Sequence, residues 1–197
     1  MRLRHLALPL ATVLTLTLSA CSKEPTDAPA TNEGAPIASA QVYDAVAAAG
    51  KGFTAGPMMN ANTVYVLFDP QCPHCGRLWQ AALPLLDKVK FVWVPVAIMN
   101  AKSAPQGAAL LQATDPVAAM SAHKSALLQG QGGMSASASV PDEILQAIKA
   151  NSLLLDRLGA DSVPFIVARH AGTGQPVTHS GALDTNDLLA FLGLGKP

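Results

Sequence analysis

Runs of apolar, β-branched and aromatic residues predict four strands in the chain. The continuous run Val64–Phe68 is typical of a strand buried on both faces, and residues 90–98 predict a second such strand. Pro95 lacks a backbone N–H, so we expect an edge, a bulge or an early end in that second strand. Residues 164–168 and 176–179 predict two short strands that form a hairpin.

Segments with apolar residues at helical spacing separate these strands. We expect a helix from about Cys72 to about Lys88, with a kink at Pro84. Residues 103–158 are expected to be mostly helical, interrupted by a Gly- and Ser-rich loop at 130–139. Asp184 can cap a last helix. The expected order is strand, helix, strand, helical block, strand, strand, helix.

The first 20 residues have the parts of a secretory signal peptide. Residues 2–5 supply positive charge, and residues 6–18 are apolar but too few to span a bilayer as a permanent helix. Residues 18–20 offer a small-residue cleavage site. Cys21 follows directly, so residues 18–21 look like a bacterial lipobox, whose cysteine is lipidated. Ordinary cleavage near Ala20 is the alternative.

This pattern divides the chain into four parts. Residues 1–20 are the expected lipoprotein signal peptide, and residues 21–40, rich in Pro, Ala, Ser and Thr, are a lipidated N-terminus and flexible tether. Residues 41–61 are expected to be a linker helix and lead-in. Residues 62–197 are expected to form the folded catalytic domain.

Composition and charge narrow the class of protein. Half of the 197 residues are apolar and 13% are charged, which suits one globular domain with some extra sequence. Lys and Arg number 13, as do Asp and Glu, and no basic block occurs. We therefore exclude nucleic acid as a partner. Removal of the signal peptide takes two basic residues and leaves 11 against 13 acidic ones, so the mature chain is mildly acidic.

Two of the three cysteines, Cys72 and Cys75, open the expected first helix. Unpaired N–H groups at a helix N-terminus favour thiolate over thiol, so Cys72 is the expected attacking cysteine. Cys75 lies one turn further along the same face, within reach of a disulfide, and is the expected resolving cysteine. Pro73 stiffens the first turn, and His74 is expected to stabilise the Cys72 thiolate if it is protonated or acts as a donor.

The compartment strengthens the redox interpretation of the pair. If Cys21 is lipidated, Cys72 and Cys75 are the one free pair in an oxidising, extracytoplasmic compartment. We expect no cofactor beyond a redox-active disulfide between these two cysteines.

Two other roles for the pair stay open. A structural zinc site needs about four ligands, and only His123, His170 and His179 remain as scattered candidates. His123 and His170 are expected to be solvated, which leaves His179 on a strand as the candidate to watch, and no metal site is predicted. An inert structural disulfide fits poorly, because so short a loop gains little chain entropy.

Val163 and Pro164 are expected to face the cysteine pair. A cis proline at the first position of a strand presents neighbouring backbone groups for pairing with an extended substrate. A trans proline that starts an edge strand is the alternative. Together with the order of elements, these features predict an α/β, thioredoxin-like fold with a helical insertion at about 103–158 between the second and third core strands.

Three segments resemble the catalytic domain of the DsbC/DsbG family of periplasmic thiol-disulfide interchange proteins, and DsbG most closely: Val64–Cys75, Leu78–Leu86 and Leu153–Val167. The resemblance covers about residues 41–195. It implies that Cys72 attacks, that Cys75 resolves, and that Pro164 is the cis-proline facing them.

The chain departs from this family in two ways. The tether and short helix leave no room for the family's N-terminal dimerisation domain, so we expect a monomer. Val163 stands where the family typically has Thr, as in DsbA-type oxidases, and Pro73-His74 is also the DsbA dipeptide. The scaffold is therefore DsbG-like, whereas the tuning residues favour an oxidant.

The expected function is a periplasmic thiol:disulfide oxidoreductase, anchored to a bacterial membrane through Cys21, with Ser22 slightly favouring the outer membrane. Expected partners are protein thiols and disulfides and a DsbD-like or DsbB-like membrane redox protein. A reductase that protects single protein thiols, or a disulfide isomerase, is the alternative among enzymes. A metal-delivery or peptide-binding module is the alternative outside them.

Overall fold

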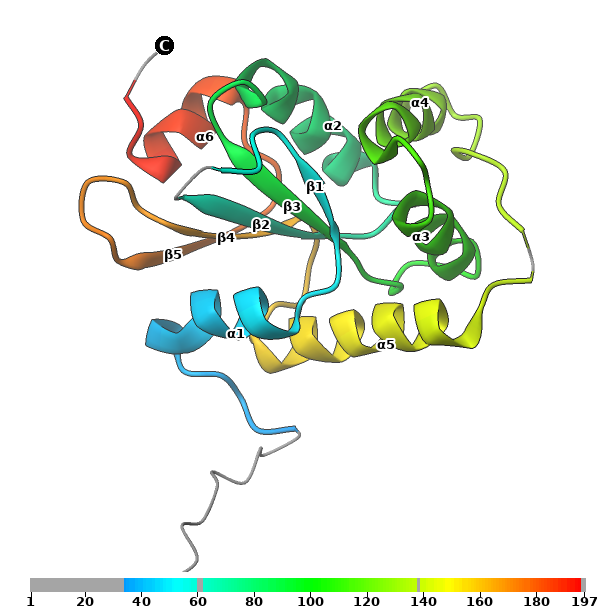
Figure 1. Ribbon diagram of the computed structural model, residues 1–197, viewed down its shortest axis with the longest axis horizontal. Helices are drawn as coiled ribbons and strands as arrows, with labels where there is room; N and C mark the ends of the chain where they lie inside the picture. Colours follow the sequence, from blue (N-terminus) through cyan, green and yellow to red (C-terminus); the bar gives the residue numbers. More distant parts are fainter. Residues whose placement is uncertain (1–33, 60–61, 138, 196–197) are drawn as a thin grey trace, which may run out of the picture. The chain divides into compact units, whose positions relative to one another are not determined.

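A five-stranded sheet lies at the centre of the computed structural model, which describes residues 34–59, 62–137 and 139–195 (Figure 1). The expected signal peptide, Cys21 and most of the expected tether lie outside the described residues. The strands are β1 (Phe53–Ala55), β2 (Thr63–Phe68), β3 (Lys90–Pro95), β4 (Phe165–Arg169) and β5 (Pro176–Ser180).

The strands lie side by side in the order β1-β3-β2-β4-β5. β2 runs parallel to β3, and the other neighbouring pairs are antiparallel. All four predicted strands are present, and β4 and β5 form the predicted hairpin. β1 was not predicted, because three residues are too few to show a period, although Phe53 pairs with Trp93 of β3. β3 is thus a central strand that ends early at Pro95, and the edge alternative is wrong.

The helices follow the predicted order, with one difference after the cysteine pair. They are α1 (Val42–Ala49), α2 (Pro73–Ala82), α3 (Ser103–Leu111), α4 (Pro116–Leu128), α5 (Asp142–Arg157) and α6 (Thr185–Leu192), with short 3-10 turns η1 (Ser39–Gln41) and η2 (Leu83–Leu85). The first long helix was expected to continue through a kink at Pro84, and this was wrong. α2 ends at Ala82 and Pro84 lies in η2, because proline has no N–H to continue the helical bonding.

Helices cover both faces of the sheet (Figure 1). α2, α4 and α6 cover one face, where Phe68, Trp79 and Trp93 form the centre of the larger apolar cluster. α1 and α5 cover the other, where Leu67 meets Val46 and other side chains. Helices α3, α4 and α5 are inserted between β3 and β4, so the predicted α/β fold with a helical insertion is confirmed.

α1 is packed as part of this unit, although it was expected to belong to a lead-in. Val42 and Val46 are buried, and Asp44 pairs with Arg169 of β4 at 2.7 Å between Oδ1 and the guanidinium. The segment after α1 is held by Asn151 of α5, whose Oδ1 accepts from Lys51 N at 2.9 Å. The Asn151 amide donates to the carbonyls of Lys51 at 2.8 Å and Pro95 at 2.9 Å, and so ties the end of β3 to α5.

Candidate active site

Cys72 lies where the chain turns from β2 into α2. It is the N-cap of α2, in an extended conformation, and its Sγ accepts a hydrogen bond from Cys75 N at 3.4 Å. Pro73 occupies the first turn, where a missing N–H costs nothing. Both cysteines are free thiols, with 4% of Cys72 and 0% of Cys75 exposed.

Val163 and Pro164 face this pair. β4 pairs with β2, so the residues before β4 reach the end of the sheet at which Cys72 stands. The Val163–Pro164 peptide bond is cis, and the Cys72 thiol donates to the Val163 carbonyl with 3.4 Å between Sγ and O. The structure thus brings together the cysteines, Val163 and Pro164, as the sequence predicted.

The surroundings of Cys72 favour its thiolate. Its pKa falls to about 6, chiefly because the Cys75 thiol donates a hydrogen bond to it. Burial opposes this shift, while the backbone N–H groups of Cys75 and His74 and the charge of Lys124 support it. Burial first, and the hydrogen bond to Cys72 second, raise the pKa of Cys75 well above the ordinary value. Cys72 is therefore the more readily ionised thiol of the two, and Cys75 stays protonated.

His74 contributes through its backbone. Its imidazole Nδ1 lies 2.7 Å from a guanidinium nitrogen of Arg77, which can only donate, so Nδ1 is the acceptor of this bond. Of the groups of His74, the backbone N–H is the one that helps to lower the pKa of Cys72.

Asp69 was not singled out in the sequence, yet it organises the loop before Cys72. Its side chain is fully buried. The carboxylate accepts from Gln71 N at 2.8 Å and from the Ser103 hydroxyl at 2.7 Å through Oδ1. Oδ2 accepts from the N–H groups of Ile98 at 2.8 Å and Met99 at 3.0 Å. This carboxylate joins the segments that follow β2 and β3. The sequence signal for Asp69 was its position directly after an apolar strand.

Lys124 and His123 of α4 also contact this loop. Lys124 Nζ donates to the carbonyls of Asp69 at 3.0 Å and Pro70 at 2.7 Å. His123 Nε2 lies 2.8 Å from the same Pro70 carbonyl, to which it donates. His123 was expected to be solvated, and this was wrong, since both side chains are almost completely buried. Their spacing from buried Met120, three and four residues away, was the only sequence signal.

The loop after α4 closes over the same site. His123 Nδ1 accepts from Met134 N at 3.0 Å, and burial lowers the pKa of His123, which keeps the ring neutral. Gly133 has a φ of +82°, and a Cβ there would lie 2.4 Å from the His123 ring. The Gln71 amide donates to the Gly132 carbonyl at 2.9 Å, so the loop and the cysteine motif are joined directly.

The remaining histidines lie elsewhere. His179 on β5 packs against Phe191 with ring centroids 5.9 Å apart, and His170 Nδ1 accepts from Gly172 N at 3.2 Å. Within residues 34–59, 62–137 and 139–195, no group of three or more His, Cys, Asp or Glu side chains is placed to hold a metal ion. In the same residues, no helix is long and apolar enough to cross a membrane.

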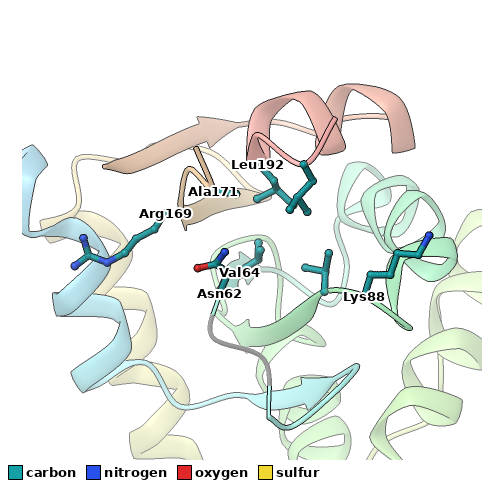
Figure 2. A pocket seen from close by; sticks show the side chains of 8 residues that line it. Asn62, Val64, Lys88, Arg169, Ala171 and Leu192 are labelled. Atoms are coloured by element: carbon teal, nitrogen blue, oxygen red, sulfur yellow. The ribbon is translucent and has the colours of Figure 1, made fainter. Parts of the chain in front are cut away.

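A small cavity lies at the end of the sheet away from Cys72 (Figure 2). Val64, at the start of β2, and Leu192, at the end of α6, line it, and the Arg169 guanidinium turns away from it towards α1. Its volume of ≈ 40 Å³ has room for no more than a few water molecules, at about 10–15 Å³ each. This cavity is too small for a peptide and is not lined by either cysteine, so it is not part of the candidate active site.

The sequence is similar to thiol:disulfide interchange proteins. No family model matches the sequence. The chain is 31% identical over 133 residues to the thiol:disulfide interchange protein DsbG of Pseudomonas aeruginosa, which covers 66% of this chain and 50% of that protein. The chain spans about half the length of the curated relatives it matches.

Solved structures with the same fold are more distant in sequence. The catalytic domain of Proteus mirabilis ScsC superposes with a TM-score of 0.61 at 18% identity, over 77% of this chain and 95% of that one. A periplasmic thioredoxin-like protein of Salmonella enterica serovar Typhimurium gives 0.62 at 14% identity, over 79% and 96%. The predicted resemblance to DsbG and the thioredoxin-like fold are confirmed.

Proposed function

We propose that this chain, which is DsbG-like in sequence and thioredoxin-like in fold, exchanges disulfides with protein substrates through Cys72 and Cys75. The observation that carries the proposal is a free Cys72 at the N-cap of α2, with a pKa of about 6, held against the cis Val163–Pro164 bond. A thiolate at neutral pH is the species that attacks a disulfide.

The exchange proceeds in two steps. The Cys72 thiolate attacks one sulfur of a substrate disulfide, a Cys72–substrate disulfide forms, and the other substrate sulfur leaves as a thiolate that takes a proton from solvent. Cys75 then loses its proton and attacks Cys72 Sγ, which releases the second substrate sulfur as a thiolate. The substrate gains two electrons and the cysteine pair becomes a disulfide. The reverse sequence oxidises a substrate dithiol.

Surface features next to Cys72 support a protein substrate. The backbone of Val163 lies beside Cys72, with 3.4 Å between Sγ and the Val163 carbonyl oxygen, and is the proposed contact for an extended substrate chain. Ile98 and Met99, whose N–H groups bind Asp69, leave 45% and 49% of their side chains exposed. Exposed apolar side chains on a segment that Asp69 joins to the loop before Cys72 suit an unfolded or partly folded polypeptide.

The pKa of Cys72 bears on the direction of exchange. A value of about 6 lies below the ~7 of thioredoxin and above the ~3.5 of DsbA. A lower pKa stabilises the reduced form and makes the disulfide a better oxidant. We propose a pair more oxidising than thioredoxin, in line with Pro73-His74 and Val163.

We further propose that the protein works in the periplasm and is anchored by a lipid on Cys21, as its leader and lipobox-like residues suggest. A periplasmic location supports the function because dithiol oxidants act in oxidising compartments. A DsbD-like or DsbB-like membrane protein is the proposed redox partner, and a single chain is the proposed working unit.

The mechanism is tested by trapping. In the Cys75→Ala variant the Cys72–substrate disulfide cannot be resolved from within, so mixed disulfides with envelope proteins should accumulate. Non-reducing gels of acid-quenched cells measure them, and the Cys72→Ala variant is the matched control that should trap none. If both variants give the same pattern, exchange through Cys72 is ruled out.

A further inference from the structure

Lys124 is buried against the loop that precedes Cys72, and only 1% of it is exposed. Its ammonium donates to the backbone carbonyls of Asp69 and Pro70 and lies 5.3 Å from the centroid of the Phe68 ring. A buried charge is costly unless other groups compensate it. Carbonyl dipoles and a ring face compensate it only in part, which raises the question of where its counter-charge lies.

Four titratable groups face Lys124. The Asp69 carboxylate is one, and its oxygens are already bound to the backbone N–H groups of Gln71, Ile98 and Met99 and to the Ser103 hydroxyl. His123 is neutral, because burial lowers its pKa. Cys72 and Cys75 are the other two. The Cys72 N–H donates at 3.1 Å to the same Asp69 carbonyl that Lys124 binds, and both cysteines interact electrostatically with Lys124.

These groups act on Lys124 in opposite directions. Burial lowers its pKa to about 8, while Cys75, Cys72 and Asp69 each raise it. Asp69 takes no part in the exchange. The Cys72 thiolate exists only in the reduced state, so the charge balance around Lys124 changes with every exchange.

We propose that Lys124 is a positioning residue whose buried positive charge stabilises the Cys72 thiolate and thereby sets the reduction potential of the cysteine pair. The inference rests on the proposed function, and it assigns control of the reduction potential to a residue of α4, in the helical insertion.

The charge balance gives the sign of the effect. When the pair is oxidised, the Cys72 thiolate and Cys75 thiol become a disulfide, two electrons pass to the substrate disulfide, and the Cys75 proton passes to solvent. The negative charge on Cys72 disappears while the Lys124 ammonium stays buried. Lys124 therefore favours the reduced state, and its presence makes the disulfide a stronger oxidant.

Substitution of Lys124 separates charge from packing. Lys124→Met keeps the length of the side chain without charge, and Lys124→Gln keeps N–H donors for the Asp69 and Pro70 carbonyls without charge. Lys124→Arg keeps the charge, and Lys149→Met removes an exposed lysine of α5 as a matched control. Circular dichroism selects the variants that fold.

The readouts are the pH titration of Cys72 by thiolate absorbance and the equilibrium of the pair with glutathione. The Met and Gln variants should raise the pKa of Cys72 by up to about one unit, because Lys124 is the smallest of the causes that lower it. They should shift the equilibrium towards the disulfide by up to about tenfold, which is about 30 mV towards a more reducing pair. The Lys124→Arg variant should lie nearer to the wild type than the Met and Gln variants do. The Lys149→Met control should match the wild type.

Two results would overturn the inference. If the Gln variant titrates like the wild type, Lys124 acts only as a hydrogen-bond donor to the loop. If Lys149→Met raises the pKa of Cys72 as much as Lys124→Met does, the effect comes from the net charge of the protein and not from the buried position of Lys124. Failure of the proposed function is distinct, because in that case the wild type itself exchanges no disulfide with glutathione.

Discussion

Cys72 and Cys75 differ in environment although they are three residues apart. Cys72 accepts hydrogen bonds at the open end of α2, whereas Cys75 is fully enclosed by the apolar cluster beneath it. The hydrogen bond from the Cys75 thiol, backbone donors and a buried cation lower the pKa of Cys72, and burial raises the pKa of Cys75. One thiol is therefore prepared to attack, and the second is withheld until a mixed disulfide forms.

This difference predicts the pH dependence of alkylation in the reduced protein. Only the thiolate reacts, and the Cys72 pKa is about 6, so the rate of iodoacetamide modification should rise as pH increases through 6 and level off above it. An ordinary cysteine, with a pKa of about 8.5, still gains rate well above neutral pH. Mass spectrometry of the modified peptide measures the profile.

The Cys72→Ala variant is the control for this experiment, since the raised pKa of Cys75 should leave it almost unmodified at neutral pH. A Cys72 profile that keeps rising to pH 8 or beyond, as expected of a pKa of about 8.5, would contradict the stabilised thiolate.

Residue-scale prediction from sequence succeeded where the signal was local. Cys72, Cys75 and Pro164 stand at element boundaries that composition marks clearly. Lys124 lies more than 50 residues from the Asp69 and Pro70 carbonyls that it binds, as the separations of 55 and 54 show. A sequence pattern carries no information on such a contact, because only folding of the insertion brings the two segments together.

At the scale of elements, polar side chains of α5 hold the backbone at the end of β3: Ser152 accepts from Ala97 N at 3.0 Å, and Asn151 makes several bonds. The Asn151 side chain accepts from the Lys51 N–H and donates to the carbonyls of Lys51 and Pro95, where β3 ends. This contact also explains how three-residue β1 is placed, because Lys51 lies two residues before it. Neither β1 nor the hydrogen bonds of Asn151 can be predicted from periodicity, since both depend on pairing between distant segments.

The Asn151→Ala variant should therefore lower the free energy of unfolding by about 2 to 3 kcal/mol, because buried backbone groups lose their partners. Urea denaturation measures the change. Asn186→Ala, at an exposed position of α6, is the control and should stay within about 0.5 kcal/mol of the wild type. Equal stability of the two variants would mean that water replaces the Asn151 amide.

At the scale of the molecule, the helical insertion completes the active site. α4 packs against α2 and brings His123 and Lys124 to the loop before Cys72, and its following loop covers them. The order of elements was predictable, because strand and helix periods differ strongly along the chain. The function of the insertion was not, because α4 combines apolar, small and charged residues without a clear apolar stripe.

The proposed anchor gives a prediction for the whole chain. Cys21→Ser removes the lipid attachment site, so the variant should move from the membrane fraction to the soluble envelope fraction. Fractionation followed by immunoblotting measures this, and Ser22→Ala is the control that should stay with the membrane. If the wild type is already soluble, the leader is an ordinary signal peptide.

The tryptophans of this protein have a practical consequence. The chain contains two, Trp79 and Trp93, which are almost fully buried with ring centroids 5.0 Å apart. Trp79 lies one turn after Cys75 on α2, and its indole N–H donates to Ser121 of α4 at 3.1 Å. Indole emission depends on its immediate surroundings, and all of it arises from this one place. The protein thus carries an intrinsic optical reporter between its thiols and its insertion, and redox cycling can be followed without any dye.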